Sequence, residues 1–184
     1  MKDVNLSEDT IEKTEILMNL ARAVLFLFGL CIFMMSPEMT AAQSGSMTGI
    51  VSQAEILENN RIYSIYKDRY QPEESAINYL KTYDDSVDVM VFWGSWCKES
   101  KKHIPSLIKT LELAGNAKIN TQYIGVDVSK EFPQEFLNKF DIKYIPTVVV
   151  LKGNAELGRI EEEPQLSIET DFVQILQKDD KGIE

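Results

Sequence analysis

The residue of this chain best suited to chemistry is Cys97, which follows two tryptophans, Trp93 and Trp96. The stretch before it, residues 87–92, is apolar with little alternation, which is typical of a strand buried on both faces. Apolar spacing after it predicts a helix, so Cys97 falls at the first helical turn. Unpaired N–H groups and the helix dipole favour negative charge there. We therefore expect a thiolate that reacts at neutral pH; the alternative is a small, buried apolar side chain.

Charged and polar neighbours surround this cysteine in the sequence. Ser100 lies about one helical turn further on, so its hydroxyl is expected on the same face as the sulfur. Glu99 opposes the local positive charge. That charge comes from three lysines: Lys98, Lys101 and Lys102. Cys97 and Ser100 are accordingly the expected catalytic residues.

Three motifs in this chain resemble those of thioredoxins. Residues 92–97 (FWGSWC) are similar to the approach to the thioredoxin active site, and Pro105 falls where that family kinks the helix that follows. Residues 144–147 (YIPT), followed by four apolar residues, resemble the cis-proline loop and its strand. The resemblance covers roughly residues 72–177. It implies an α/β, thioredoxin-like fold with a central mixed β-sheet flanked by helices.

The resemblance also implies which residues meet a substrate. In thioredoxins the proline loop lies beside the reactive cysteine, and the bond before the proline is cis. Backbone groups of Ile145 would then pair with an extended peptide, as in strand addition. Trp96, Ile145 and Pro146 are therefore the expected substrate-binding residues.

Departures from the family pattern concern the second thiol and a buried ion pair. The family's Cys-x-x-Cys dithiol ends here in Ser100, so a hydroxyl replaces the resolving thiol. Val91 stands where thioredoxins commonly bury an acid, and Tyr123 where they carry a lysine. Residues 96–100 (WCKES) and the Gly-Arg-Ile turn at residues 158–160 resemble a single-cysteine subgroup of bacterial thioredoxin-like proteins.

A single thiol limits the chemistry that we expect. Cys97 would form mixed disulfides with proteins or low-molecular-weight thiols, and an outside thiol would have to release them. The hypothesis is a monothiol oxidoreductase or isomerase. The alternative is a catalytically inactive peptide-binding module of the same fold.

Composition argues against several other functions. The 184 residues carry a net charge of −10 without a basic stripe, so we expect no nucleic-acid partner. His103, the only histidine, lies six residues after Cys97 and on another side of the helix, which predicts an exposed side chain rather than a catalytic partner. No cluster with metal-ligand spacing follows residue 42, and no metal or cofactor is expected.

The N-terminal third is expected to be targeting sequence and spacer. An apolar run at residues 23–35 suits a signal-peptide core, and small residues at 40–42 suit cleavage. The acidic segment before the run is unlike a signal peptide, so an uncleaved membrane anchor and a cytosolic amphipathic helix are alternatives. We expect export to the periplasm or cell envelope, rather than a cytoplasmic location. Cleavage would remove Cys31.

Residues 1–42 are thus the expected signal peptide or anchor, 43–71 a linker and N-terminal extension, and 72–184 the thioredoxin-like domain. Within the extension, residues 61–70 carry three tyrosines and are expected to pack against the domain. Aromatic residues at helical spacing are expected in the core: Phe132, Phe136 and Phe140. Helices are predicted at 50–59, 72–83, 98–114, 131–140 and 168–177, and strands at 87–92, 118–128, 148–151 and 156–160.

Overall fold

The computed structural model describes residue 18 and residues 46–180, so the expected signal sequence and Cys31 lie outside the described residues. Every element below belongs to one compact unit, Ser44–Glu184. The elements are β1 (Gly49–Val51), α2 (Gln53–Asn59), α3 (Arg61–Arg69), α4 (Glu74–Thr82), β2 (Val87–Trp93), α5 (Lys98–Ala114), β3 (Ile119–Gly125), α6 (Gln134–Lys139), β4 (Thr147–Lys152), β5 (Ala155–Glu161) and α7 (Ile168–Asp180). Among the described residues, no helix has the length and apolar character needed to cross a membrane.

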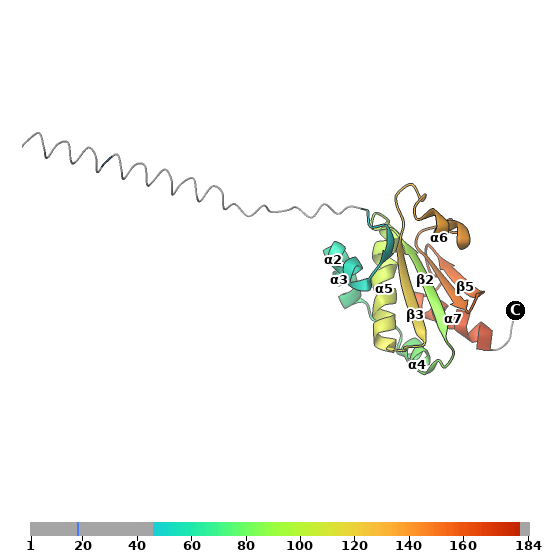
Figure 1. Cartoon of the computed structure of the whole chain (residues 1–184). Coiled ribbons are helices and arrows are strands. Elements are labelled where there is room, and N and C mark those ends of the chain that lie inside the picture. The colour runs from blue at the N-terminus through green and yellow to red at the C-terminus, as the bar shows by residue number, and fades with distance from the viewer. Residues whose placement is uncertain (1–17, 19–45, 181–184) are drawn as a thin grey trace, which may run out of the picture. The chain divides into compact units, whose positions relative to one another are not determined.

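The strands form one mixed sheet in the order β1-β3-β2-β4-β5. β2 and β3 run parallel, while the other neighbouring pairs are antiparallel. Figure 1 shows the sheet between helices, with α5 along one side and α6 on the other. The predicted α/β fold with a helix-flanked mixed sheet is confirmed. Its central strand, β2, buries both faces at the end that leads to Cys97, because Val91, Phe92 and Trp93 are fully covered.

Helix α5 carries the site and forms as its sequence predicts. Cys97 is its N-cap, Pro105 lies inside it, and it ends at Gly115. Gly115 has a φ of +57°, a left-handed conformation that glycine adopts without a Cβ penalty. One face of the helix packs on the sheet through Ile104, Leu107 and Ile108.

The N-terminal extension is part of the sheet and of the core. Strand β1 pairs with β3, and the helices that follow bury Ile56 and Tyr63 completely. The predicted helix at 50–59 starts only at Gln53, because Ser52 forms a capping box with Glu55. Residues 49–51 are therefore free to extend the sheet, although their spacing predicted a helix from residue 50.

The segment before α6 also differs from the prediction. Phe132 is 54% exposed and Phe136 is half-buried, so Phe140 is the only one of the three that is buried. Asp127 accepts the backbone N–H groups of Glu131 and Phe132, which holds these residues in a turn instead of a helix. The helical spacing of the three rings therefore predicted the burial of Phe132 wrongly.

A buried carboxylate ties the extension to the last helix, and it gives a stability prediction. Glu169 is 2% exposed and accepts hydrogen bonds from the Tyr70 hydroxyl at 2.5 Å and the Glu73 N–H at 3.2 Å. Replacing Tyr70 by phenylalanine removes one hydrogen bond to the buried carboxylate, so we expect the free energy of unfolding to fall by about 1–3 kcal/mol. Urea unfolding measures it, with Tyr66→Phe on the exposed face of α3 as the control. Equal losses in both variants would contradict the prediction.

Candidate functional site

Two segments that are 48 residues apart meet at Cys97. The Cys97 side chain is half-buried at the N-terminus of α5, and its S–H donates to the Ile145 carbonyl oxygen at 3.3 Å. The Ile145–Pro146 bond is cis, as the resemblance implies. Figure 1 shows the start of α5 at the same end of the sheet as the loop that enters β4. The sulfur and the proline loop thus form one site.

Trp96 shapes the loop before the cysteine. Its indole N–H donates to the Val126 carbonyl oxygen at 2.9 Å, which fixes the ring beside the end of β3. The ring also covers Gly94 so closely that a Cβ there would lie 2.7 Å from it. A glycine at position 94 is therefore required by this packing. Trp96 remains half-buried, and it packs with Cys97 against the core cluster that contains Ile145.

Ser100 is fully buried, and its hydroxyl oxygen accepts the backbone N–H of Gly94 at 3.1 Å. The sequence placed this hydroxyl on the face of the sulfur. In the structure its hydrogen bond closes the turn between β2 and α5, and the Cys97 N–H reinforces that turn by donating to the Gly94 carbonyl oxygen. Ser100 therefore positions the residues that carry the cysteine.

Val91 and Tyr123 occupy the places of the missing acid–lysine pair. They are register partners across β2 and β3, and both are buried. Burial raises the pKa of Tyr123, and the charge of Glu112 adds to that rise. The phenol is consequently neutral at physiological pH, and this pair of side chains offers no carboxylate or ammonium for proton transfer.

Tyr63 is a residue of the site's surroundings that the sequence did not single out. It is fully buried on α3 and packs edge-on against Trp93, with ring centroids 5.7 Å apart. Within residues 46–180 its hydroxyl has no hydrogen-bond partner. Burial raises the pKa of Tyr63, and the charge of a Cys97 thiolate raises it further. Helical spacing alone could have placed Tyr63 in the core, but not near the sulfur.

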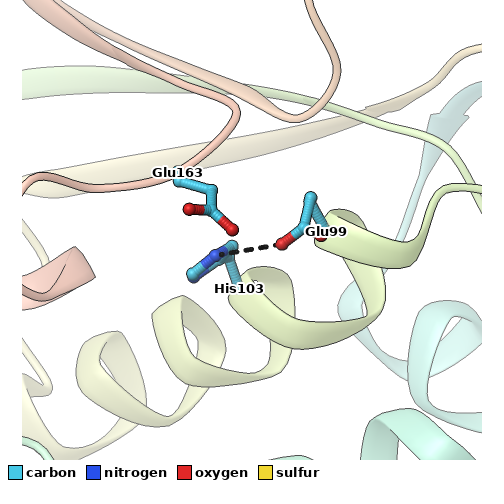
Figure 2. Close-up of side chains that lie close together, drawn as sticks. All are labelled: Glu99, His103 and Glu163. Atoms are coloured by element: carbon cyan, nitrogen blue, oxygen red, sulfur yellow. Dashed lines mark ion pairs between the residues drawn. The ribbon is translucent and has the colours of Figure 1, made fainter.

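His103 is buried, which corrects the prediction of an exposed histidine. It is 8% exposed, and its Nε2 atom lies 3.6 Å from a carboxylate oxygen of Glu99. Glu163 approaches both from the loop after β5, as Figure 2 shows. Burial lowers the pKa of His103, as does the charge of Lys102, while Glu163 opposes them. The imidazole is therefore neutral at pH 7. These three side chains are the group among the described residues that could hold a metal ion.

A mixed sheet of this strand order, with a cysteine at the mouth of the helix after β2 and a cis-proline loop against its sulfur, defines a thioredoxin-like protein. The thioredoxin family model matches residues 46–171, and the chain belongs to that family. The match begins at the N-terminal extension, in agreement with the role of β1, α2 and α3 in the fold.

Solved structures resemble the chain at low sequence identity. An HIV epitope scaffold is 15% identical, with 71% of this chain and 84% of that one covered and a TM-score of 0.51. A protein of unknown function from Pseudomonas aeruginosa is 16% identical over the same shares, with a TM-score of 0.49. The germline-specific thioredoxin Deadhead from Drosophila melanogaster is 24% identical over 56% of this chain and 88% of its own, with a TM-score of 0.39. At such identities the likeness concerns the fold alone. No curated protein matches the chain.

Proposed function

We propose that this chain is a thiol–disulfide exchange protein that acts through the single thiol of Cys97. The observation that carries the proposal is the position of this sulfur. It is half-buried at the N-terminus of a 17-residue helix and in contact with the carbonyl of Ile145 in the proline loop. Cys97 is also the only cysteine within residues 46–180. The site therefore has one attacking sulfur, and no resolving sulfur, in the described part of the chain.

The exchange follows from this arrangement. The Cys97 thiolate attacks one sulfur of a substrate disulfide, that S–S bond breaks, and the departing sulfur leaves as a thiolate that takes up a proton. A mixed disulfide between Cys97 and the substrate remains. A low-molecular-weight thiol, as its thiolate, then attacks the substrate sulfur and releases the Cys97 thiolate. The disulfide bond now joins the substrate sulfur to the small thiol, and the Cys97 thiolate is regenerated without a cofactor.

The substrates that we propose are extended peptides and small-thiol adducts. Ile145 places its backbone next to the sulfur. Tyr144, its neighbour in the loop, is 46% exposed, and Trp96, one residue before Cys97, is half-buried. These are side chains that a bound peptide would cover. Nucleic acid is not among the proposed substrates, because the sequence is acidic and carries no basic stripe that would bind phosphates.

We further propose that the protein works in the cell envelope. This part of the proposal is supported by the apolar run at residues 23–35 and the small residues after it. In an oxidising compartment a lone thiol persists as a thiol, a mixed disulfide or an intermolecular dimer, and each of these states is compatible with exchange.

Trapping of the mixed disulfide tests the function. The full chain with Cys31→Ser is incubated with a peptide disulfide, and its mass is measured without reductant. We expect one adduct, located on Cys97 and released by a small thiol. It should form faster than in the same chain unfolded in denaturant, because the folded site holds the sulfur beside the Ile145 backbone, with which an extended peptide would pair. An adduct that forms no faster in the folded chain would overturn the proposal.

One contact favours a second function, a peptide-binding module without catalysis. An S–H that donates to the Ile145 carbonyl is a thiol, and its proton has to leave this bond before attack is possible. If the thiol stays in this bond, the loop would still bind extended peptides. Peptide binding that is equal in the parent and in Cys97→Ala, combined with the absence of an adduct, would favour this function over exchange.

A further inference from the structure

Three ionisable side chains that the proposed exchange reaction does not use converge beside α5. Glu99 and His103 are four residues apart on the helix and so share one face. Glu163 reaches them from the loop that follows β5 (Figure 2). One oxygen or nitrogen atom from each residue lies within 4.8 Å of the other two. Residues distant in sequence therefore present an imidazole and two carboxylates to one point.

The groups at this point lack the partners that buried polar atoms normally have. The side-chain Oε2 of Glu99 and Nε2 of His103 are both buried and have no hydrogen-bond partner within the described part of the chain. They face each other at 3.6 Å, which is too long for a hydrogen bond. Leaving such atoms unpaired is costly. A cation between them would satisfy both, and it would also relieve the repulsion between the two carboxylates.

We propose that Glu99, His103 and Glu163 form a binding site for a divalent transition metal ion of the zinc type. One neutral imidazole nitrogen and two carboxylate oxygens are donors that zinc accepts, and three protein ligands leave a fourth position for water. Metal–ligand bonds of about 2.0–2.2 Å in a tetrahedron place ligand atoms about 3.4 Å apart. Glu99 and His103 already have nearly this spacing. The side chain of Glu163 is 63% exposed and free to close the remaining gap.

The ammonium group of Lys102 would compete with a metal ion for the two carboxylates. It lies 3.9 Å from Glu99 and 3.5 Å from Glu163, so both contacts are loose. The side chain is 58% exposed and can move into solvent when a metal ion binds.

Access to the site is provided by a cavity of about 480 Å³. Its lining includes His103, Lys102 and Glu163 together with Tyr66 and Tyr70. An ion can therefore reach the nearly buried imidazole without unfolding of α5.

Zinc titration of the full chain tests this proposal. Cys31 and Cys97 are replaced by serine, so that no thiol competes for the metal, and binding of Zn²⁺ is followed by calorimetry and by thermal unfolding. We expect one ion per chain and a raised unfolding temperature, with no comparable effect of Mg²⁺, which prefers six oxygen ligands. Glu163→Gln and His103→Gln should each weaken binding at least about tenfold.

Glu162→Gln is the matched control, because it removes an equal charge from an exposed neighbour outside the cluster. It should leave zinc affinity unchanged, and Lys102→Met should raise it. The exposed position of Glu163 makes its variant informative even if His103→Gln fails to fold. Absence of zinc binding by the parent, or equal affinities of the Glu162→Gln and Glu163→Gln variants, would overturn the proposal.

Discussion

Replacement of Cys97 by serine is expected to reduce the catalysed reduction of a protein disulfide to the background rate of the small thiol alone. A hydroxyl at this position cannot form the mixed disulfide. The change should not disturb the fold, because Cys97 is the N-cap of α5 and makes no capping hydrogen bond with its side chain. Serine is a preferred N-cap residue, so stability should be unchanged or higher by about 0.5–1 kcal/mol. Disulfide reduction and urea unfolding are measured on the same preparations.

The dependence on the small thiol distinguishes a single-thiol protein from a dithiol one. Because Cys97 is the only cysteine in residues 46–180, we expect the parent rate to rise with the concentration of the small thiol. Cys31→Ser serves as the control that removes the other sulfur of the chain and should retain full activity. A Cys97→Ser variant as active as the parent would remove the case for catalysis and leave only the fold assignment.

Much of the fold could be predicted because strong local signals coincide with the elements. The apolar run of β2, the amphipathic pattern of α5 and the glycine at its end each correspond to one structural requirement. Strand β1 could not be predicted, since three residues carry no periodicity and its role depends on pairing with β3. The prediction that Phe132 lies on a helix and in the core was wrong, because Asp127, five residues earlier, holds the local backbone in a turn.

The residues of the site likewise include some whose positions the sequence could predict and others whose positions it could not. Cys97, Trp96 and the proline loop belong to motifs, so their places were predictable. The burial of His103 was not, because it arises from Glu163 and from elements far away in the sequence. A signal was nevertheless present: glutamate and histidine at i and i+4 on one helix face are spaced as potential metal ligands. The hydrogen bond of Ser100 to Gly94 depends on the backbone of the turn, which spacing does not specify.

Ser100→Cys is expected to convert the site from dependence on an outside thiol to internal resolution. The residue lies on the first turn of α5, three positions after Cys97. A thiol there can attack the mixed disulfide on Cys97 intramolecularly, which releases the substrate as a thiol and leaves a disulfide between positions 97 and 100. The hydrogen bond from Gly94 would pass to a weaker sulfur acceptor, with an expected loss of stability of about 0.5–1.5 kcal/mol.

Two measurements on chains with Cys31→Ser check this conversion. The adduct on Cys97 should accumulate in the parent and disappear in Ser100→Cys without any added small thiol, and the variant should lose both free thiols on oxidation. Ser106→Cys is the matched control, since it adds a buried thiol to the same helix about 9 Å beyond Ser100 along its axis. It should retain the adduct. Persistence of the adduct in Ser100→Cys would mean that the buried turn held by Gly94 keeps position 100 from reaching the sulfur, and that the serine is not a simple replacement for a resolving cysteine.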